Sequence, residues 1–111
     1  MASKNKLLWE ILIPKFSNDG KEFEIEFHKK WDKKIGKISG GLTILRTAKG
    51  HWINPDKKLF SEEMIPVRIY CSEKEIGKIM KFTLEHYTQD AVFCYLVSNK
   101  IKILNKNKNL T

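Results

Sequence analysis

Residues 40–70, GGLTILRTAKGHWINPDKKLFSEEMIPVRIY, hold the side chains whose types and spacing best suit chemistry. His51 lies there in an expected loop, and imidazole is the side chain whose ordinary pKa is nearest neutral pH. A general base also needs a carboxylate that orients it. Glu62 or Glu63 could return to His51 across a hairpin, which would suit a small hydrolase or isomerase. Ligand contact and a purely structural role are the other interpretations of His51, and we assign no catalytic residue.

The two arginines, Arg46 and Arg68, stand out in a chain with 19 lysines. A guanidinium group binds phosphate or carboxylate through two parallel hydrogen bonds and stacks on bases, which an ammonium group does not do. The sequence therefore favours a non-enzymatic binding protein that holds a small anionic ligand, such as a nucleotide or a nucleotide-derived signal. The residues expected to bind this ligand are Arg46, His51, Trp52, Glu63, Arg68, Tyr70, Gln89 and Tyr95.

The sequence lacks the usual patterns of metal and cofactor sites. Cys71 and Cys94 do not have C-x-x-C spacing and fit two small buried side chains. No H-E-x-x-H, P-loop, G-x-G-x-x-G or G-x-S-x-G pattern occurs. We therefore expect neither a metal nor a cofactor.

The charge balance favours an anionic partner. The net charge is +8, carried almost wholly by lysine. A lysine-rich solvated surface that reflects the base composition of the gene is the alternative. Since no apolar run approaches the roughly 20 residues of a membrane helix, we expect no membrane partner. The N-terminal segment lacks the pattern of a signal peptide, so a cytoplasmic protein is expected.

Hydrophobic periodicity predicts the elements that would position these residues. Apolar residues recur every second position in the expected strands and every third or fourth position in the expected helices. Ser72 and Glu75 form a capping-box pattern, and Gly40 suits a helix end. The expected strands are 7–14, 42–47, 64–71 and 91–97, and the expected helices are 21–39 and 72–87. Residues 48–58 are expected to form a loop or a wide hairpin connection.

The order β-α-β-β-α-β predicts an α+β fold of the ferredoxin-like type. Two helices would cover one face of a four-stranded antiparallel sheet. A single domain would span residues 1–104, followed by a mobile tail of lysine and asparagine at 105–111.

Two helices leave the second face of such a sheet uncovered. Alternation places Arg68 and Tyr70 on that open face, where Arg68 could pair with Glu10 of the first strand. Tyr95 and other apolar residues would surround the pair, and monomeric proteins rarely expose a large apolar patch. We therefore expect a homo-oligomer, for which a dimeric α+β barrel is one arrangement. The third strand lacks the RNA-binding pattern K/R-G-F/Y-G/A-F, so single-stranded nucleic-acid binding through Tyr70 and Tyr95 is less favoured, as is a purely structural role.

Several short blocks of the sequence resemble a family of small uncharacterised proteins of bacteria and their phages. The resemblance spans residues 7–104 and is most specific at GGLT (40–43), GHW (50–52), Glu63 and Gln89. Position 51 is often glutamine or another polar residue in that family, which argues against acid–base catalysis by His51. The resemblance implies the same fold, and it would suit a phage protein that sequesters a messenger of host defence.

Overall fold

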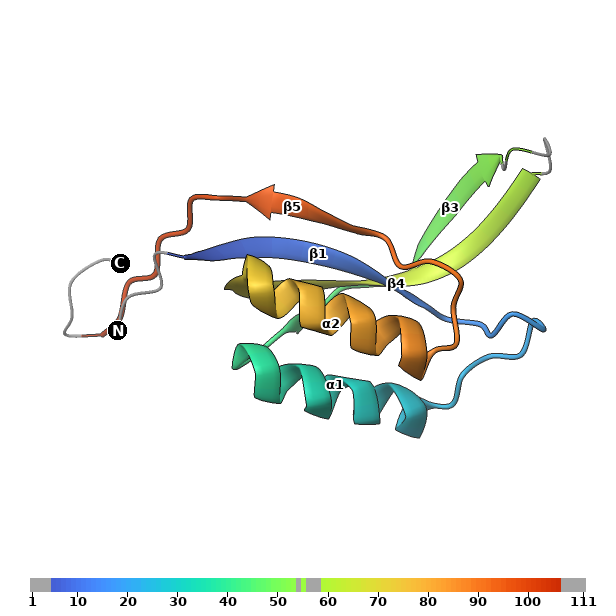
Figure 1. Ribbon diagram of the computed structural model, residues 1–111, viewed down its shortest axis with the longest axis horizontal. Coiled ribbons are helices and arrows are strands. Elements are labelled where there is room, and N and C mark those ends of the chain that lie inside the picture. The colour runs from blue at the N-terminus through green and yellow to red at the C-terminus, as the bar shows by residue number, and fades with distance from the viewer. Residues whose placement is uncertain (1–4, 54, 56–58, 107–111) are drawn as a thin grey trace.

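The computed structural model describes residues 5–53, 55 and 59–106, of which residues 52 and 59–61 are described by backbone alone. Five strands form one antiparallel sheet in the order β2-β4-β1-β5, with β3 paired to the outer part of β4. Both helices pack on the same face of this sheet (Figure 1). The elements are β1 (Lys6–Pro14), α1 (Ile25–Ser39), β2 (Thr43–Ile44), β3 (Ala48–Ile53), β4 (Leu59–Ser72), α2 (Glu73–His86) and β5 (Cys94–Ser98). The predicted α+β class and ferredoxin-like arrangement are confirmed.

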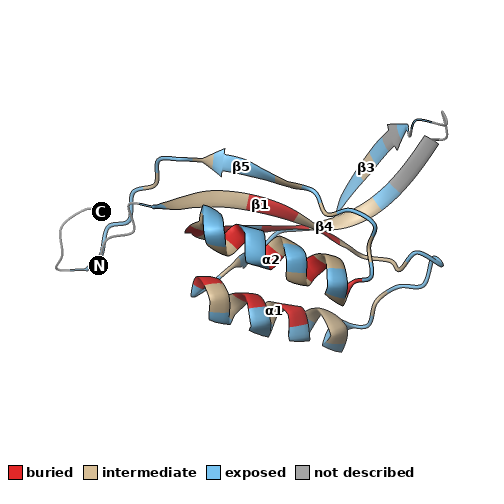
Figure 2. Cartoon of the chain, in the orientation of Figure 1, coloured by how far each residue is buried: buried red, intermediate tan, exposed pale blue. Residues whose placement is uncertain are grey.

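Alternation along β1 and β4 builds the core. Every second residue of each strand faces the helices, and this helix face includes Ile11, Ile13, Val67 and Ile69, all at most 2% exposed. The buried stripes of α1 and α2 cover these residues (Figure 2). Two buried polar groups are also satisfied between the helices. Trp31 Nε1 of α1 donates to Thr83 Oγ1 of α2 at 2.8 Å, and Thr83 donates in turn to a backbone carbonyl.

Helix α1 begins four residues later than the period-four stripe predicts. Phe23 belongs to that stripe but precedes the helix, where its ring stacks on Phe27 with centroids 5.1 Å apart. Gly40 ends α1 in the left-handed conformation at φ 89°, as the sequence predicts. At α2, Ser72 and Glu75 form the predicted capping box, in which each side chain accepts a hydrogen bond from the backbone of the other residue.

Residues 48–58 were expected to form a loop or a wide hairpin connection between four strands, and the structure has a hairpin there that adds a fifth strand. The expected second strand is only two residues long as β2, and the expected loop contains β3. Strand β3 pairs with residues 59–64 of β4, and this hairpin arm extends beyond the helices (Figure 1). Turn-forming residues nearby hid an alternating pattern in AKGHWI. The remaining expected loop residues, 54 and 56–58, lie outside the described part of the chain.

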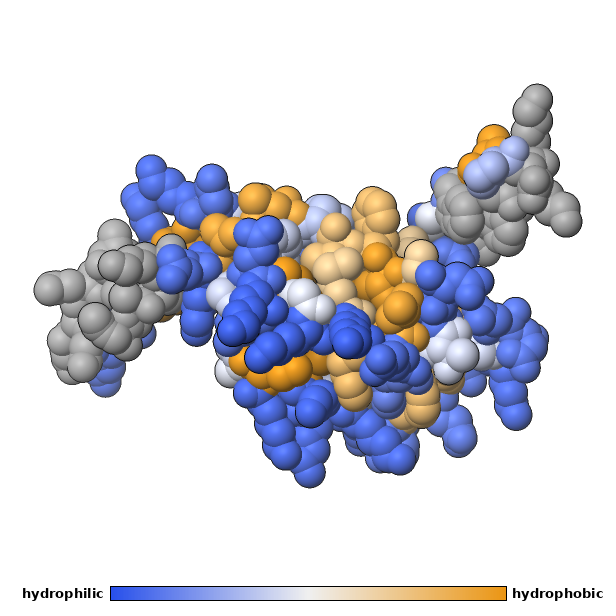
Figure 3. All heavy atoms as spheres, in the orientation of Figure 1, coloured by the Kyte–Doolittle hydropathy of each residue, from blue (hydrophilic) through white to orange (hydrophobic). Residues whose placement is uncertain are grey.

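The hydropathy of the surface differs between the helices and strand β5. Hydrophilic side chains cover the outer sides of the helices, whereas hydrophobic side chains gather along β5 (Figure 3). Exposed apolar residues of β5 and its approach include Phe93, Leu96 and Val97. No helix in the described ranges is both long and apolar enough to cross a lipid bilayer.

Candidate functional site

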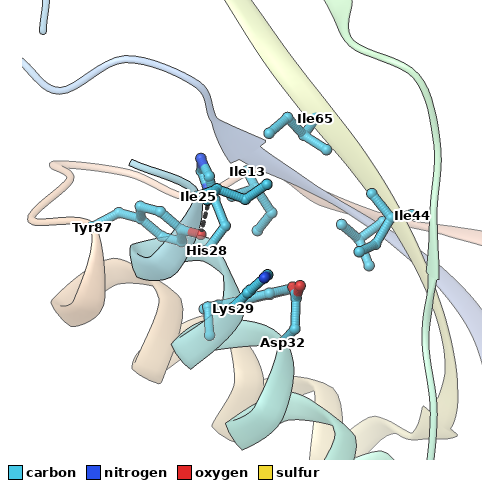
Figure 4. A pocket seen from close by; sticks show the side chains of 10 residues that line it. Ile13, Ile25, His28, Lys29, Asp32, Ile44, Ile65 and Tyr87 are labelled. Atoms are coloured by element: carbon cyan, nitrogen blue, oxygen red, sulfur yellow. Dashed lines mark hydrogen bonds between the residues drawn. The ribbon is translucent and has the colours of Figure 1, made fainter. Parts of the chain in front are cut away.

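A cavity of about 260 Å³ lies on the helix face, between α1 and the β2–β4 edge of the sheet (Figure 4). Aliphatic and indole side chains form most of its wall, and four polar side chains reach it. The apolar lining residues are Ile13, Ile25, Trp31, Ile44, Ile65 and Val67, and the polar ones are His28, Lys29, Asp32 and Tyr87.

Helical spacing and strand register bring these residues together. Ile25, His28, Lys29 and Asp32 follow one another at intervals of three, one and three residues, so they share one side of α1. The opposite wall comes from two directly paired positions of the sheet. Ile13 pairs with Ile65, and Ile44 pairs with Val67. Because β2 is only two residues long, this edge of the sheet leaves space beside α1.

His28 and Tyr87 hold each other at one end of the cavity. The His28 Nδ1 and the Tyr87 hydroxyl are 2.7 Å apart and hydrogen-bonded. Burial lowers the pKa of His28, and the negative charge of Asp32 offsets only part of this effect. Burial also raises the pKa of Tyr87, which is 2% exposed. At neutral pH both side chains are therefore uncharged.

Asp32 brings a carboxylate to the same wall. Burial raises the pKa of this carboxyl group, while the nearby His28 lowers it in part. Among the described residues, no side chain or backbone group forms a hydrogen bond or ion pair with the Asp32 carboxylate. The neighbouring Lys29 instead lies 3.6 Å from Glu26 on the exposed side of α1. The cavity thus offers one acceptor that is not already used.

The helix face continues from the cavity onto the hairpin arm. Glu63 lies two residues before Ile65 in β4 and so projects from the same face, where Lys15 Nζ is 3.8 Å from its carboxylate. His51 pairs with Ser61 and therefore also projects from this face. As diagonal neighbours, His51 and Glu63 stand roughly 7–8 Å apart. Glu62 projects from the other face, which leaves Glu63 as the carboxylate that the predicted acid–base pair could use.

The open face carries a second polar cluster, made of Glu10, Arg68 and Tyr95. Arg68 Nε donates to Glu10 Oε1 at 2.9 Å, and the Tyr95 hydroxyl donates to the other carboxylate oxygen. Burial alone would raise the pKa of Glu10, but these two hydrogen bonds bring it below its usual value of 4.5. The predicted Glu10–Arg68 pair is confirmed. Its carboxylate is nearly inaccessible in a surface where Phe93 is 65% and Tyr95 41% exposed.

The predicted ligand-binding residues lie on separate surfaces of a single chain. Arg68, Tyr70 and Tyr95 belong to the open face, and His51 and Glu63 to the hairpin arm. Gln89 follows α2, where its amide donates to the Tyr87 carbonyl. Thr43 of β2 pairs with Arg68, and about 10 Å of chain separates Thr43 from Arg46. The side chain of Trp52 is outside the described part, and the assignment of all eight residues to one ligand stays a prediction.

Sequence reasoning missed the polar residues of the cavity. Neither His28 nor Asp32 is among the site residues predicted from the sequence. Their spacing of four, together with Ile25 one turn earlier, was the available signal of a second inward-facing side. Tyr87 was recognised only as the last residue of a helical stripe.

The described residues contain no group of three or more His, Cys, Asp or Glu side chains placed to hold a metal ion. Cys71 and Cys94 are free thiols.

No protein-family model and no curated protein sequence matches the chain. The similar solved structures include a phage SAM lyase in complex with S-methyl-5'-thioadenosine, at 16% identity and a TM-score of 0.65 over 86% of this chain and 82% of the lyase chain. They also include CutA1 of Oryza sativa, at 13% identity and a TM-score of 0.63 over 90% and 83% of the two chains. A periplasmic divalent cation tolerance protein, CutA of Archaeoglobus fulgidus, matches at 10% identity and a TM-score of 0.63, over 92% of this chain and 89% of the CutA chain. At these identities the likeness establishes a common fold, and the chain is a small α+β protein of the ferredoxin-like type.

Proposed function

We propose that this protein binds a small nucleoside derivative in the cavity between α1 and the β2–β4 edge. The observation that carries the proposal is the cavity itself, in which apolar walls surround convergent polar groups of His28, Asp32 and Tyr87. Small-molecule sites are typically concave and mostly apolar, with a few polar groups that fix the orientation of the ligand. Perturbed pKa values at two of these groups are also typical of functional sites.

The size of the cavity suits the base of a nucleoside. An engineered apolar cavity of about 150 Å³ accepts benzene. A space of about 260 Å³ therefore has room for a two-ring base, with the sugar at its mouth. The phage SAM lyase of similar fold was solved with S-methyl-5'-thioadenosine, which supports a ligand of this class.

An anionic group on the ligand would meet positive charge outside the cavity. Lys29 lies at its mouth, and Lys15 lies beside Glu63 farther along the same face. Within the class of nucleoside derivatives, we therefore propose a nucleotide as the ligand. Holding a nucleotide-derived messenger without converting it would suit the sequestering role that the family resemblance implies.

The assembly that we propose is a homo-oligomer in which a second copy covers the open face. The support is the exposed apolar surface around Glu10 and Arg68, whose opposite charges cancel. Two copies with a strong positive charge could therefore meet at this face with little repulsion. Light scattering should find more than one copy per particle for the natural chain and fewer for Phe93→Lys. A natural chain that stays monomeric at high concentration would contradict this assembly.

A second candidate function is a lyase acting on S-adenosylmethionine. Two solved phage SAM lyase structures, one bound to ligand and one apo, share the fold at 16% and 15% identity. Their likeness favours this reaction over the hydrolase or isomerase expected from His51. In such a reaction the carboxylate of S-adenosylmethionine would attack the γ carbon of the amino-acid chain as the carbon–sulfur bond breaks, so that S-methyl-5'-thioadenosine leaves and the amino-acid portion closes to a lactone.

Calorimetric titration with S-methyl-5'-thioadenosine, adenosine, AMP and S-adenosylmethionine tests the proposal. Ile44→Trp should block the cavity, because Ile44 forms its wall at the sheet edge. Ile53→Trp is the matched control, since Ile53 is 66% exposed on the hairpin arm. We expect Ile44→Trp to weaken binding by more than about tenfold and Ile53→Trp to leave it unchanged.

The same samples separate binding from turnover. Chromatography with mass detection should recover S-adenosylmethionine intact from a binder. Its conversion to S-methyl-5'-thioadenosine, lost in Ile44→Trp, would establish the lyase instead. If none of the four compounds binds or reacts, or if Ile44→Trp binds them as the natural chain does, the proposed function is wrong.

A further inference from the structure

We infer that the cavity selects bases carrying an exocyclic amino group, with Asp32 as the residue that recognises this group. This inference rests on the proposed function and names the class of ligand that the site accepts. Most polar side chains of the cavity already have a partner within the described part of the chain, and the Asp32 carboxylate does not.

The other polar side chains of the cavity have partners. The His28 Nδ1 and the Tyr87 hydroxyl engage each other across 2.7 Å, while the second ring nitrogen of His28, Nε2, has no hydrogen-bond partner in the described part of the chain. The Lys29 ammonium is paired with Glu26 on the outer side of α1. Asp32 alone among the four polar lining residues has neither a hydrogen-bond nor an ion-pair partner in the described part of the chain. A ligand in the cavity would therefore find its strongest unused contact there.

An ionised carboxylate accepts hydrogen bonds and donates none. An amino group on the ring of a base donates, so it matches Asp32. A carbonyl oxygen at the same ring position would bring two acceptors together, and the half-buried Asp32 would have a partner only if the ring shifted to present its N1–H instead. A site that loses a hydrogen-bonded partner in this way discriminates strongly between the two ligands.

The placement of Asp32 lets a flat ring make this contact. Asp32 lies one turn after His28 on α1, and both side chains project toward the sheet (Figure 4). Ile44 and Ile65 form the facing aliphatic wall. A base lying between that wall and the helix would present one edge to Asp32. The ligand class is thus an aminopurine nucleoside, such as an adenosine derivative, in preference to its 6-oxo counterpart.

The test compares S-methyl-5'-thioadenosine with S-methyl-5'-thioinosine, which differ in the 6-amino and 6-oxo groups and in the hydrogen that the oxo compound carries on N1. Calorimetry would measure both dissociation constants in the natural chain, in Asp32→Asn and in the control Glu26→Gln. Glu26 is a matched carboxylate on the exposed side of the same helix. We expect the natural chain and the control to prefer the amino compound by about tenfold or more. Asparagine donates as well as accepts, so Asp32→Asn should lose most of this preference.

The outcomes separate the two proposals. Equal affinity for both compounds in the natural chain, or an unchanged preference in Asp32→Asn, would overturn the role of Asp32 and leave ligand binding in place. Binding of neither compound would overturn both proposals. Thermal melting of the two variants shows whether each retains the fold, and Asp32→Glu gives a second test because it keeps the acceptor but displaces it.

Discussion

The Glu10–Arg68 pair gives a quantitative stability prediction, made with the variant Arg68→Met. Methionine keeps much of the aliphatic stem but removes the Nε donor that lies 2.9 Å from the Glu10 carboxylate. The Glu10 side chain is 8% exposed, so its charge would stay largely out of water with Tyr95 as its remaining described partner. A hydrogen bond to a charged group contributes about 1.5–3 kcal/mol. Because the Arg68 side chain is 45% exposed and solvent weakens the attraction, we expect a loss near 1.5 kcal/mol.

Urea unfolding at neutral pH measures this loss, with Lys29→Met as the control. Lys29 and Glu26 are 3.6 Å apart with side chains 63% and 76% exposed, so breaking their pair should cost less than about 0.5 kcal/mol. The double variant Glu10→Leu/Arg68→Met removes both charges and should recover most of the lost stability. Equal losses in Arg68→Met and Lys29→Met, or a double variant less stable than Arg68→Met, would refute this reasoning.

Three further predictions concern single groups. The pKa of Glu10 lies below 4.5, so the stabilising contribution of its carboxylate is present above that pH and is lost as the pH falls through the lowered pKa. In Glu10→Gln, the stability measured by urea unfolding should therefore depend less on pH in the acid range. Gly40→Ala should lower the free energy of unfolding by about 1–2 kcal/mol, because Gly40 has φ 89° even though an added Cβ would meet open space. Gly36→Ala, inside α1, should instead raise the free energy of unfolding. Burial raises the pKa of Cys71 to about 12 and of Cys94 to about 11, so a disulfide reagent should modify them far more slowly in the folded chain than in urea; equal rates would contradict their burial.

The sheet register and the main caps could be predicted because each depends on local, repeated signals. Alternation in the first and third expected strands placed Glu10 opposite Arg68, which the structure confirms. The Ser72–Glu75 spacing predicted the start of α2. These features rest on periods of two residues and on caps within one turn, which a single sequence displays directly.

The strand character of β3 and the cavity could not be predicted in the same way, although a hairpin connection was one of the two expectations for residues 48–58. Strand β3 contains Gly50 and lies next to turn-forming residues, so its alternation was outweighed by a loop-like composition. The cavity depends on β2 ending after two residues, which leaves α1 facing an incomplete sheet edge. His28 and Asp32 acquire their inward position only through that tertiary arrangement, which helical periodicity alone does not specify.

Methyl NMR of isoleucine-labelled protein tests the central claim most directly, since the cavity contains isoleucines and matched isoleucines lie elsewhere. Addition of S-methyl-5'-thioadenosine should shift the methyl signals of Ile13, Ile44 and Ile65, which line the cavity, in a saturable manner. The signals of Ile53 on the hairpin arm and of Ile79 on the buried side of α2 should remain in place. Unchanged cavity signals, or shifts confined to residues outside the cavity, would contradict ligand binding at this site.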